Sequence, residues 1–357
     1  MKESMQVIRS RSFARAGFLG NPSDGYFGKT ISFSFTEFCV DLRLTESSRL
    51  RFVPGEVDDA SFESPRQLVR DLRLYGYYGG IRMLKAVAKL FFEYCEEHSI
   101  EIADANFTAE YKINVPRLVG LSGSSAICSA MLKALMEFYG VDIPIEDQPT
   151  IIMCAERDEL GIACGLQDRV AQIYNGLVFM DFNRDLMEKT GHGAYERLDA
   201  HIAALQPRLY IAYDTRRAEE SGKAHRKVLQ RFQRHDRDVT AAMSEFADIA
   251  QQGRDAIVEG RIAALPELVN ANFDLRDRIF NVSEENRRMV MVARGAGASA
   301  KFAGSGGAIV GLCDEGPGFE ALSNALAEIG CRTIRPQIAV KADEERELDS
   351  SAVWRNS

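Results

Sequence analysis

The chain has 357 residues, 46% of them hydrophobic, which is enough to bury a large core and to form two domains. The formal net charge is -8 and no Lys/Arg-rich block stands out, so nucleic acid is not an expected partner. No apolar run approaches the roughly 18 residues of a membrane span, and arginines interrupt the N-terminal stretch where a signal peptide would be apolar. The seven cysteines are scattered without a C-x-x-C pair, so we expect reduced thiols in a cytoplasmic protein without membrane contact.

The stretch GNPSDGYFGKT, residues 20–30, ends like an ATP-binding P-loop but departs from that pattern. Ser23 stands where the pattern needs a glycine, and a strand period follows instead of a helix (Ile31, Phe33, Phe35). The stretch is therefore interpreted as a loop that joins two strands, over residues 7–19 and 30–44. A phosphate-binding loop must then lie elsewhere.

The remaining periodicities predict helices and strands in mixed order. In the first half we expect helices at 64–74, 79–97, 149–160 and 167–174, a helix that ends near 140, and strands at 106–114 and 176–182. In the second half we expect a strand at 208–214, three or four helices between 223 and 295, and two short strands within 301–313. This mixture predicts an α+β fold, with a boundary near residue 200 that divides domains 1–200 and 201–357.

A turn of small residues precedes the helix that ends near residue 140. It consists of Gly120, Leu121, Ser122, Gly123, Ser124, Ser125 and Ala126. Small residues at a helix start leave the first-turn amides free, and the helix dipole favours an anion there. The turn is the better phosphate-loop candidate, although a serine that only caps the helix would give the same pattern.

Two acidic residues and a second glycine-rich stretch add to this pattern. Glu156 lies near the end of one predicted helix, and Asp168 lies at the start of the next, past the GIACG turn. An exposed helical charge and a capping acid are the plainer interpretations of these two residues. Consecutive glycines within residues 301–307 indicate either a close backbone approach to a ligand or a simple hairpin.

Together these stretches resemble the GHMP kinase family in three ordered motifs, ARAGFLGNPSDGYFG (14–28), PRLVGLSGSSA (116–126) and KFAGSGG (301–307). The resemblance implies a two-domain fold, with an N-terminal domain like domain 2 of ribosomal protein S5 and a ferredoxin-like C-terminal domain. It also implies ATP and Mg2+ as cofactors. Within the family, the similarity is greatest to the enzymes that make glucuronate 1-phosphate, and it extends to LYGYYGGIRML (74–84) and ELGIACGLQDRVAQIYNGLVFMDF (159–182).

The resemblance also implies roles for residues around the transferred phosphate. Asp168 matches the catalytic aspartate and Arg15 the basic residue paired with it, while Glu156 and Ser125 match magnesium ligands. The loop reads GLSGSSA, one residue longer than the family's usual GLGSSA or GLSSSA, which leaves the register within residues 122–125 open.

On the sugar side, Asn21 stands where galactokinases of the family have a glutamate that faces the C6 hydroxyl. A glutamate would repel a substrate carboxylate by ~1 kcal/mol at 4 Å in bulk water, and by about 4 at an effective dielectric constant of 20. Asn21 removes this repulsion and so favours a uronic acid. Further expected substrate contacts are Asp24, Tyr26, Gly304, Ser305 and Gly306, with Arg169 or Arg82 for the carboxylate.

Other interpretations keep the kinase fold and the ATP site but change the acceptor or the activity. The acceptor could be galactose, arabinose, fucose or a heptose, or the chain could be a sensor that binds sugar and ATP without phosphate transfer. A scaffold has no supporting motif. The expected partner is a small sugar or uronic acid, and the expected assembly is a monomer or homodimer.

Overall fold

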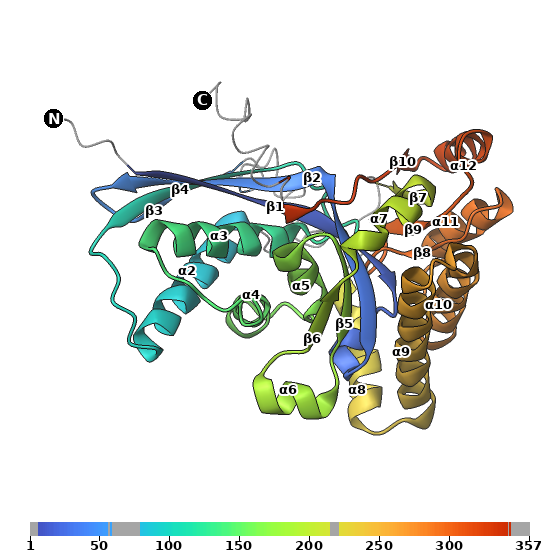
Figure 1. The fold of residues 1–357 in the computed structure, drawn as a ribbon, viewed down its shortest axis with the longest axis horizontal. Coiled ribbons are helices and arrows are strands. Elements are labelled where there is room, and N and C mark those ends of the chain that lie inside the picture. The colour runs from blue at the N-terminus through green and yellow to red at the C-terminus, as the bar shows by residue number, and fades with distance from the viewer. Residues whose placement is uncertain (1–5, 56–57, 59–78, 215–220, 342, 344–357) are drawn as a thin grey trace, which may run out of the picture.

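The computed structural model describes residues 6–55, 58, 79–214, 221–341 and 343, without the side chains of residues 221–226. It contains two β-sheets with helices packed around them (Figure 1). The strands of the first sheet are β1 (Val7–Leu19), β2 (Lys29–Ser47), β3 (Arg51–Phe52), β4 (Asn106–Ile113), β5 (Leu177–Asp181) and β6 (Ala194–Arg197).

Strand β2 is the centre of the first sheet. It pairs with β1 along one edge, and its other edge pairs with β4 through residues 40–47 and with β5 through residues 29–33. All of these pairs are antiparallel, and the short β3 pairs parallel with β4. Ile31, Phe33 and Phe35 are fully buried, so the alternation in the sequence corresponds to one packed face.

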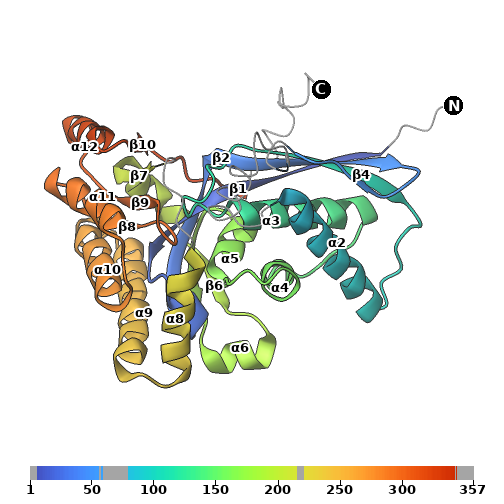
Figure 2. The ribbon, with the colours of Figure 1, turned by 180° about the vertical axis from the view of Figure 1, so that it is seen from behind.

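Helices cover one face of this sheet (Figures 1 and 2). They are α2 (Gly80–Glu97), α3 (Gly123–Tyr139), α4 (Gln148–Cys154) with a π-helical turn (Ala155–Glu159) and α5 (Gln167–Tyr174), while α6 (Arg184–Thr190) lies beyond the ends of β5 and β6. Leu84, Val87 and Phe91 recur at helical spacing on α2 and are buried in one cluster with side chains of β2 and α3. This packing fixes the start of α3 beside the sheet.

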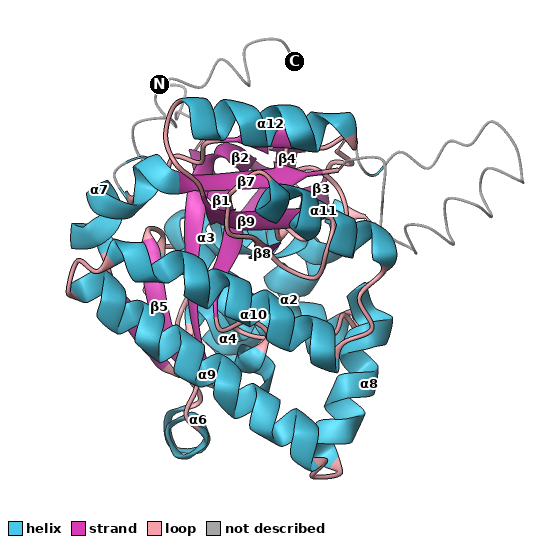
Figure 3. Cartoon of the chain, turned by 90° about the vertical axis from the view of Figure 1, so that its right-hand side faces the viewer, coloured by secondary structure: helices cyan, strands magenta, loops and turns pink. Residues whose placement is uncertain are grey.

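The second sheet has the order β10-β7-β9-β8 and is formed by β7 (Leu209–Tyr213), β8 (Lys301–Phe302), β9 (Ala308–Leu312) and β10 (Arg332–Ile334). Its helices are α7 (Ile202–Leu205), α8 (Ser221–Gln233), α9 (Arg237–Val258), α10 (Leu265–Ile279), α11 (Glu284–Gly295) and α12 (Pro317–Glu328). Figure 3 shows α9 and α10 side by side and α12 over the second sheet. Short 3-10 turns occupy Ser23–Tyr26, Asp199–His201, Gln206–Arg208 and Ile262–Ala264.

The predicted strand pair, the helix at 79–97 and the later helices and strands are confirmed within about three residues. The exception is the predicted helix at 149–160, which divides into α4 and a π-helical turn. The predicted helix at 64–74 lies outside the described residues. Six α-helices and strands of the described residues had not been predicted: β3, α6, β6, α7, α12 and β10. The boundary near residue 200 stays a prediction, because the largest hydrophobic cluster contains side chains from both sheets.

Candidate active site

The loop before α3 forms one wall of a cavity. Ser122 is the N-cap of this 17-residue helix and adopts a left-handed φ of 61°, and Gly120 has a φ of 73°. A Cβ on Gly120 would lie 2.8 Å from the carbonyl oxygen of Gly306, and a Cβ on Gly304 would collide with the carbonyl of Gly120. The glycines at 120 and 304 thus let two backbones from distant parts of the chain touch.

Asp168 lies in the first turn of α5 and faces this loop. Its Oδ1 accepts a hydrogen bond from Arg15 Nε at 2.7 Å, and its Oδ2 accepts one from Ser122 Oγ at 2.6 Å. Burial alone would raise the pKa of the Asp168 carboxyl, but the charges of Arg15 and Arg169 and these two hydrogen bonds hold it well below its ordinary value of 3.8. Asp168 is therefore ionised.

Arg15, on β1, connects all three sequence motifs. Besides its ion pair with Asp168, its Nη1 donates to the carbonyl oxygens of Gly120 at 2.9 Å and Ala303 at 2.8 Å. The side chain is 6% exposed. The three acceptors hold the guanidinium, and hence the carboxylate, in one position.

A second carboxylate, Glu156, lies in the π-helical turn and is fully buried. Its Oε1 accepts from Ser124 Oγ at 2.7 Å, and its Oε2 accepts from Arg169 Nε at 2.9 Å. Arg169 also lies 3.5 Å from Asp168 Oδ2. Burial alone would lower the pKa of the Arg169 guanidinium, but Glu156 raises it, so Arg169 remains charged.

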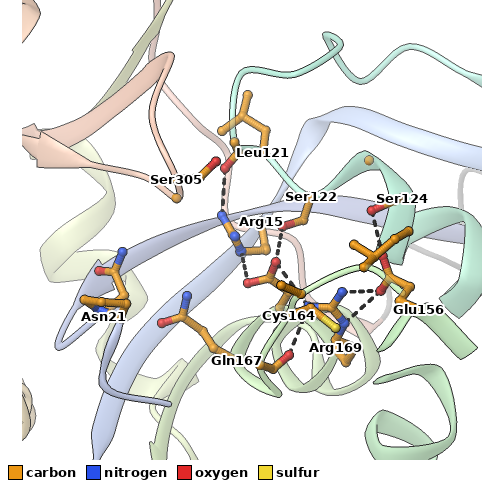
Figure 4. A pocket seen from close by; sticks show the side chains of 18 of the residues that line it. Arg15, Asn21, Leu121, Ser122, Ser124, Glu156, Cys164, Gln167, Arg169 and Ser305 are labelled. Carbon is orange, nitrogen blue, oxygen red and sulfur yellow. Dashed lines mark hydrogen bonds and ion pairs between the residues drawn. The ribbon is translucent and has the colours of Figure 1, made fainter. Parts of the chain in front are cut away.

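Residues 20–28, which we call the lip loop, form the opposite side of the cavity. In Figure 4, Asn21 and Glu156 lie on opposite sides of Arg15. Asp24 Oδ2 accepts the main-chain N–H of Gln167 at 3.3 Å. Burial and the nearby charge of Asp168 raise the pKa of the Asp24 carboxyl to about 6.

The third motif completes the wall between the loop before α3 and the lip loop. Arg276, on α10, donates from Nη1 to Gly304 O at 2.9 Å and from Nη2 to Ser305 O at 3.1 Å. Tyr26 of the lip loop packs edge-on against Phe232 of α8, with ring centroids 5.0 Å apart. Elements from both halves of the chain therefore shape the cavity.

The cavity has a volume of about 350 Å³. Most of the predicted site residues line it: Arg15, Asn21, Asp24, Tyr26, Gly120, Leu121, Ser122, Gly123, Ser124, Glu156, Asp168, Arg169, Gly304 and Ser305. Further lining residues had not been singled out from the sequence, among them Arg117, Cys164, Gln167, Leu229 and Arg276. The long-range contacts of Gln167 and Arg276 have no local sequence signal, because their partners lie far along the chain.

Four predicted site residues do not line the cavity: Arg82, Ser125, Ala126 and Gly306. Ser125 is 1% exposed, and its hydroxyl donates to the carbonyl oxygen of Ser122 at 3.2 Å. Arg82 donates to the carbonyl of Leu160 at 3.4 Å. Lys29, the residue of the near-match to a P-loop, contacts Asp181 and Gln251.

Comparison with known proteins agrees with this geometry. Residues 82–176 match the family model described as the GHMP kinases N terminal domain. The chain is 45% identical to glucuronokinase 1 of Arabidopsis thaliana over 321 residues, which are 88% of this chain and 87% of that protein. It is 47% identical to probable glucuronokinase 2 of the same plant, over 87% and 86% of the two chains. The crystal structure of Lactococcus lactis galactokinase with galactose has a TM-score of 0.70, with 16% identity and 94% of each chain covered.

A partly buried, ionised aspartate beside a glycine-rich helix start is suited to phosphoryl transfer, in which the protein mainly aligns groups and neutralises charge. The chain belongs to the GHMP kinase family. It is an ATP-dependent phosphotransferase with the GHMP kinase fold, as predicted.

Proposed function

We propose that this kinase transfers the γ-phosphate of ATP to the anomeric hydroxyl of D-glucuronate and so forms glucuronate 1-phosphate and ADP. The observation that carries this proposal is the 45–47% identity to two proteins named as glucuronokinases, over 87–88% of the chain. The cavity adds support, since its base is ionised and a neutral Asn21 lines it.

In this proposal Asp168 accepts the proton of the C1 hydroxyl as that oxygen attacks the γ-phosphorus. Arg15 keeps Asp168 ionised and offsets negative charge on the transferred group, since it lies between the base and the phosphate loop. The amides of residues 120–126 hold the ATP phosphates at the start of α3. The chain thus supplies alignment and charge, which are the main requirements of this reaction.

The residues beside the phosphate loop also fit Mg2+. Ser124 Oγ and Glu156 Oε1 are 2.7 Å apart, close to the separation of about 3 Å between adjacent oxygen ligands of octahedral magnesium. This geometry favours Ser124 in place of Ser125, whose hydroxyl points to the Ser122 carbonyl. Among the residues that the structure describes, no three His, Cys, Asp or Glu side chains cluster for a metal, so ATP and water would supply the other ligands. Bound Mg2+ would neutralise phosphate charge.

The sugar would contact the lip loop and the third motif. Asp24, Tyr26, Gly304 and Ser305 line the cavity near Asp168 and are suited to bind hydroxyl groups. Arg169 is no longer the preferred group for the carboxylate, because it already pairs with Glu156. Arg82 lies outside the cavity lining.

A reducing compartment such as the cytoplasm fits the thiols, because all seven cysteines lie among the described residues and carry thiols, not disulfides. None of the helices in the described part of the chain has the length and apolarity to cross a membrane. We propose a monomer or homodimer.

An ADP-release assay with a panel of acceptors tests the function. We expect kcat/KM for D-glucuronate to exceed the values for galactose, arabinose, fucose, glucose and heptoses by at least about tenfold, which corresponds to ~1.4 kcal/mol. If the enzyme preferred galactose, then galactose and not glucuronate would be the substrate. Binding of ATP and sugar without ADP release would instead indicate a sensor.

A further inference from the structure

Lys301 is a buried lysine that joins the third motif to the lip loop. It begins β8 and is 1% exposed. Its Nζ donates to the carbonyl oxygens of Gly17 at 2.7 Å and Phe302 at 2.8 Å, and also to Asn21 Oδ1. An ammonium group has three N–H donors, so these three acceptors use all of them. The group is held in place and is not itself available to a ligand.

The contact with Lys301 fixes the orientation of the Asn21 amide. A lysine ammonium can only donate, so the atom of Asn21 that it contacts must be the oxygen. Asn272 holds the lip-loop backbone from the other side, because its Oδ1 accepts the N–H of Gly20 at 2.6 Å and its Nδ2 donates to Asn21 O at 3.2 Å. With its oxygen engaged, the side chain of Asn21 offers the cavity an NH2 group, a donor and not an acceptor.

The surroundings of this amide are positively charged. Burial lowers the pKa of the Lys301 ammonium well below its ordinary value, and the positive charges of Arg276 and Arg15 lower it further. Arg15 pairs with Asp168, and Arg276 donates to two carbonyl oxygens of the third motif. An anion bound at Asn21 would favour the protonated form of Lys301, which has the three donors that its three acceptors need.

We propose that the Asn21 amide, oriented by Lys301, binds the carboxylate of the uronate substrate and selects it over neutral sugars. This inference rests on the proposed function. Asn21 is the substrate-binding group, and Lys301 is a positioning residue that turns the NH2 into the cavity. An arginine that contacts the carboxylate directly, as expected from the sequence, is then unnecessary.

The test compares D-glucuronate with its neutral 6-amide, which has the same shape. The measured quantity is the ratio of kcat/KM for the acid to kcat/KM for the amide. Asn21→Asp keeps the oxygen that Lys301 contacts but exchanges the NH2 for a negative oxygen, so we expect the ratio to fall at least 100-fold. Lys301→Met frees the Asn21 amide to turn, and we expect at least a tenfold fall with KM for ATP within twofold.

Tyr26→Phe is the matched control, since it changes the lip loop without adding or removing a charge, and its ratio should stay within threefold of wild type. Lys301→Met in an Asn21→Ala background should lower the ratio no further than Asn21→Ala alone, because Lys301 acts through Asn21. An unchanged ratio in Asn21→Asp would overturn the inference. So would additive effects of Asn21→Ala and Lys301→Met on the ratio. If wild type phosphorylates neither compound, the proposed function itself fails.

Discussion

The two sides of the cavity hold their carboxylates differently. On the phosphate-loop side, each carboxylate pairs with an arginine, Asp168 with Arg15 and Glu156 with Arg169, and the pKa of Asp168 is lowered. On the lip-loop side, Asp24 has a main-chain N–H as hydrogen-bond donor and a pKa raised to about 6. In the proposed function, the base Asp168 is therefore ionised at any ordinary pH, whereas sugar binding would depend on Asp24, a group that titrates near pH 6.

The largest effect should follow from removal of the charge at Asp168. In Asp168→Asn the side chain keeps its size but cannot accept the hydroxyl proton, so we expect kcat to fall by at least 1000-fold, or ~4 kcal/mol of barrier. ATP binding, measured by calorimetry, should change less than about threefold. If the purified variant kept more than about a tenth of the wild-type kcat, Asp168 would not be the base.

Replacement of Arg15, on the same side of the cavity, should make the titration of Asp168 visible in the pH dependence of kcat. In Arg15→Met the carboxyl of Asp168 stays buried but loses its main positive neighbour, so its pKa should rise. We expect kcat to fall about 100-fold, and to fall further as the pH drops through the new pKa, whereas wild type shows no such loss in kcat. A pH profile of kcat measures both effects.

Arg15→Lys serves as the control because it keeps the charge but loses the forked geometry that also reaches Gly120 and Ala303. It should be intermediate in rate and retain the flat profile. A flat profile in Arg15→Met as well would show that another group keeps Asp168 ionised.

A comparison of two adjacent serines separates metal binding from helix structure. Ser124→Ala removes the hydroxyl beside Glu156, and we expect the Mg2+ concentration for half-maximal rate to rise about tenfold, or ~1.4 kcal/mol. Ser125→Ala removes a hydrogen bond to Ser122 O, which should cost about 1 kcal/mol of unfolding free energy and leave the Mg2+ dependence within twofold. The reverse result would restore the sequence-based choice of Ser125.

Ser124 and Ser125 also show which features of the site can be predicted from the sequence and which cannot. The phosphate loop, Asp168 and the third motif could be singled out because each has a local pattern, namely small residues before a helix, an acid in a first turn, or adjacent glycines. The roles proposed for them came from the resemblance to the GHMP kinase family. The choice between Ser124 and Ser125 needs the direction of each side chain, and one residue turns a helix face by about 100°. An inserted residue in the loop therefore left the choice open.

The contacts that organise the lip loop could not be predicted at all. Lys301 and Asn21 are 280 positions apart, and Gly20 and Asn272 are 252 apart, so no local period connects them. Helix α6 was missed for another reason, since it has no buried residue and hence no apolar face. Burial patterns predict packed elements well, and they give little information about polar contacts between distant loops.

The smallest expected effect concerns Asp24 and the pH dependence of kcat/KM. It distinguishes the lip-loop side of the cavity most directly from the phosphate-loop side. If the ionised carboxylate accepts hydrogen bonds from the sugar, wild-type kcat/KM for the sugar should fall below pH 6 because KM rises. Asp24→Asn should lose this pH dependence and show a higher KM above pH 6. If kcat/KM of the Asp24→Asn variant still fell below pH 6, the titrating group would be a residue other than Asp24.

The same substitution should raise stability, and the sign follows from the pKa. Asp24 has a pKa of about 6 in the folded chain and an ordinary value of 3.8, so the folded state binds more protons between these values, and stability is lost as pH rises through 6. Asparagine cannot ionise, so Asp24→Asn should gain about 1–3 kcal/mol of unfolding free energy at pH 7.5 and little at pH 4. Thermal unfolding at the two pH values measures this. A variant that is more stable but binds sugar more weakly would show that the charge at Asp24 serves the ligand at the expense of the fold.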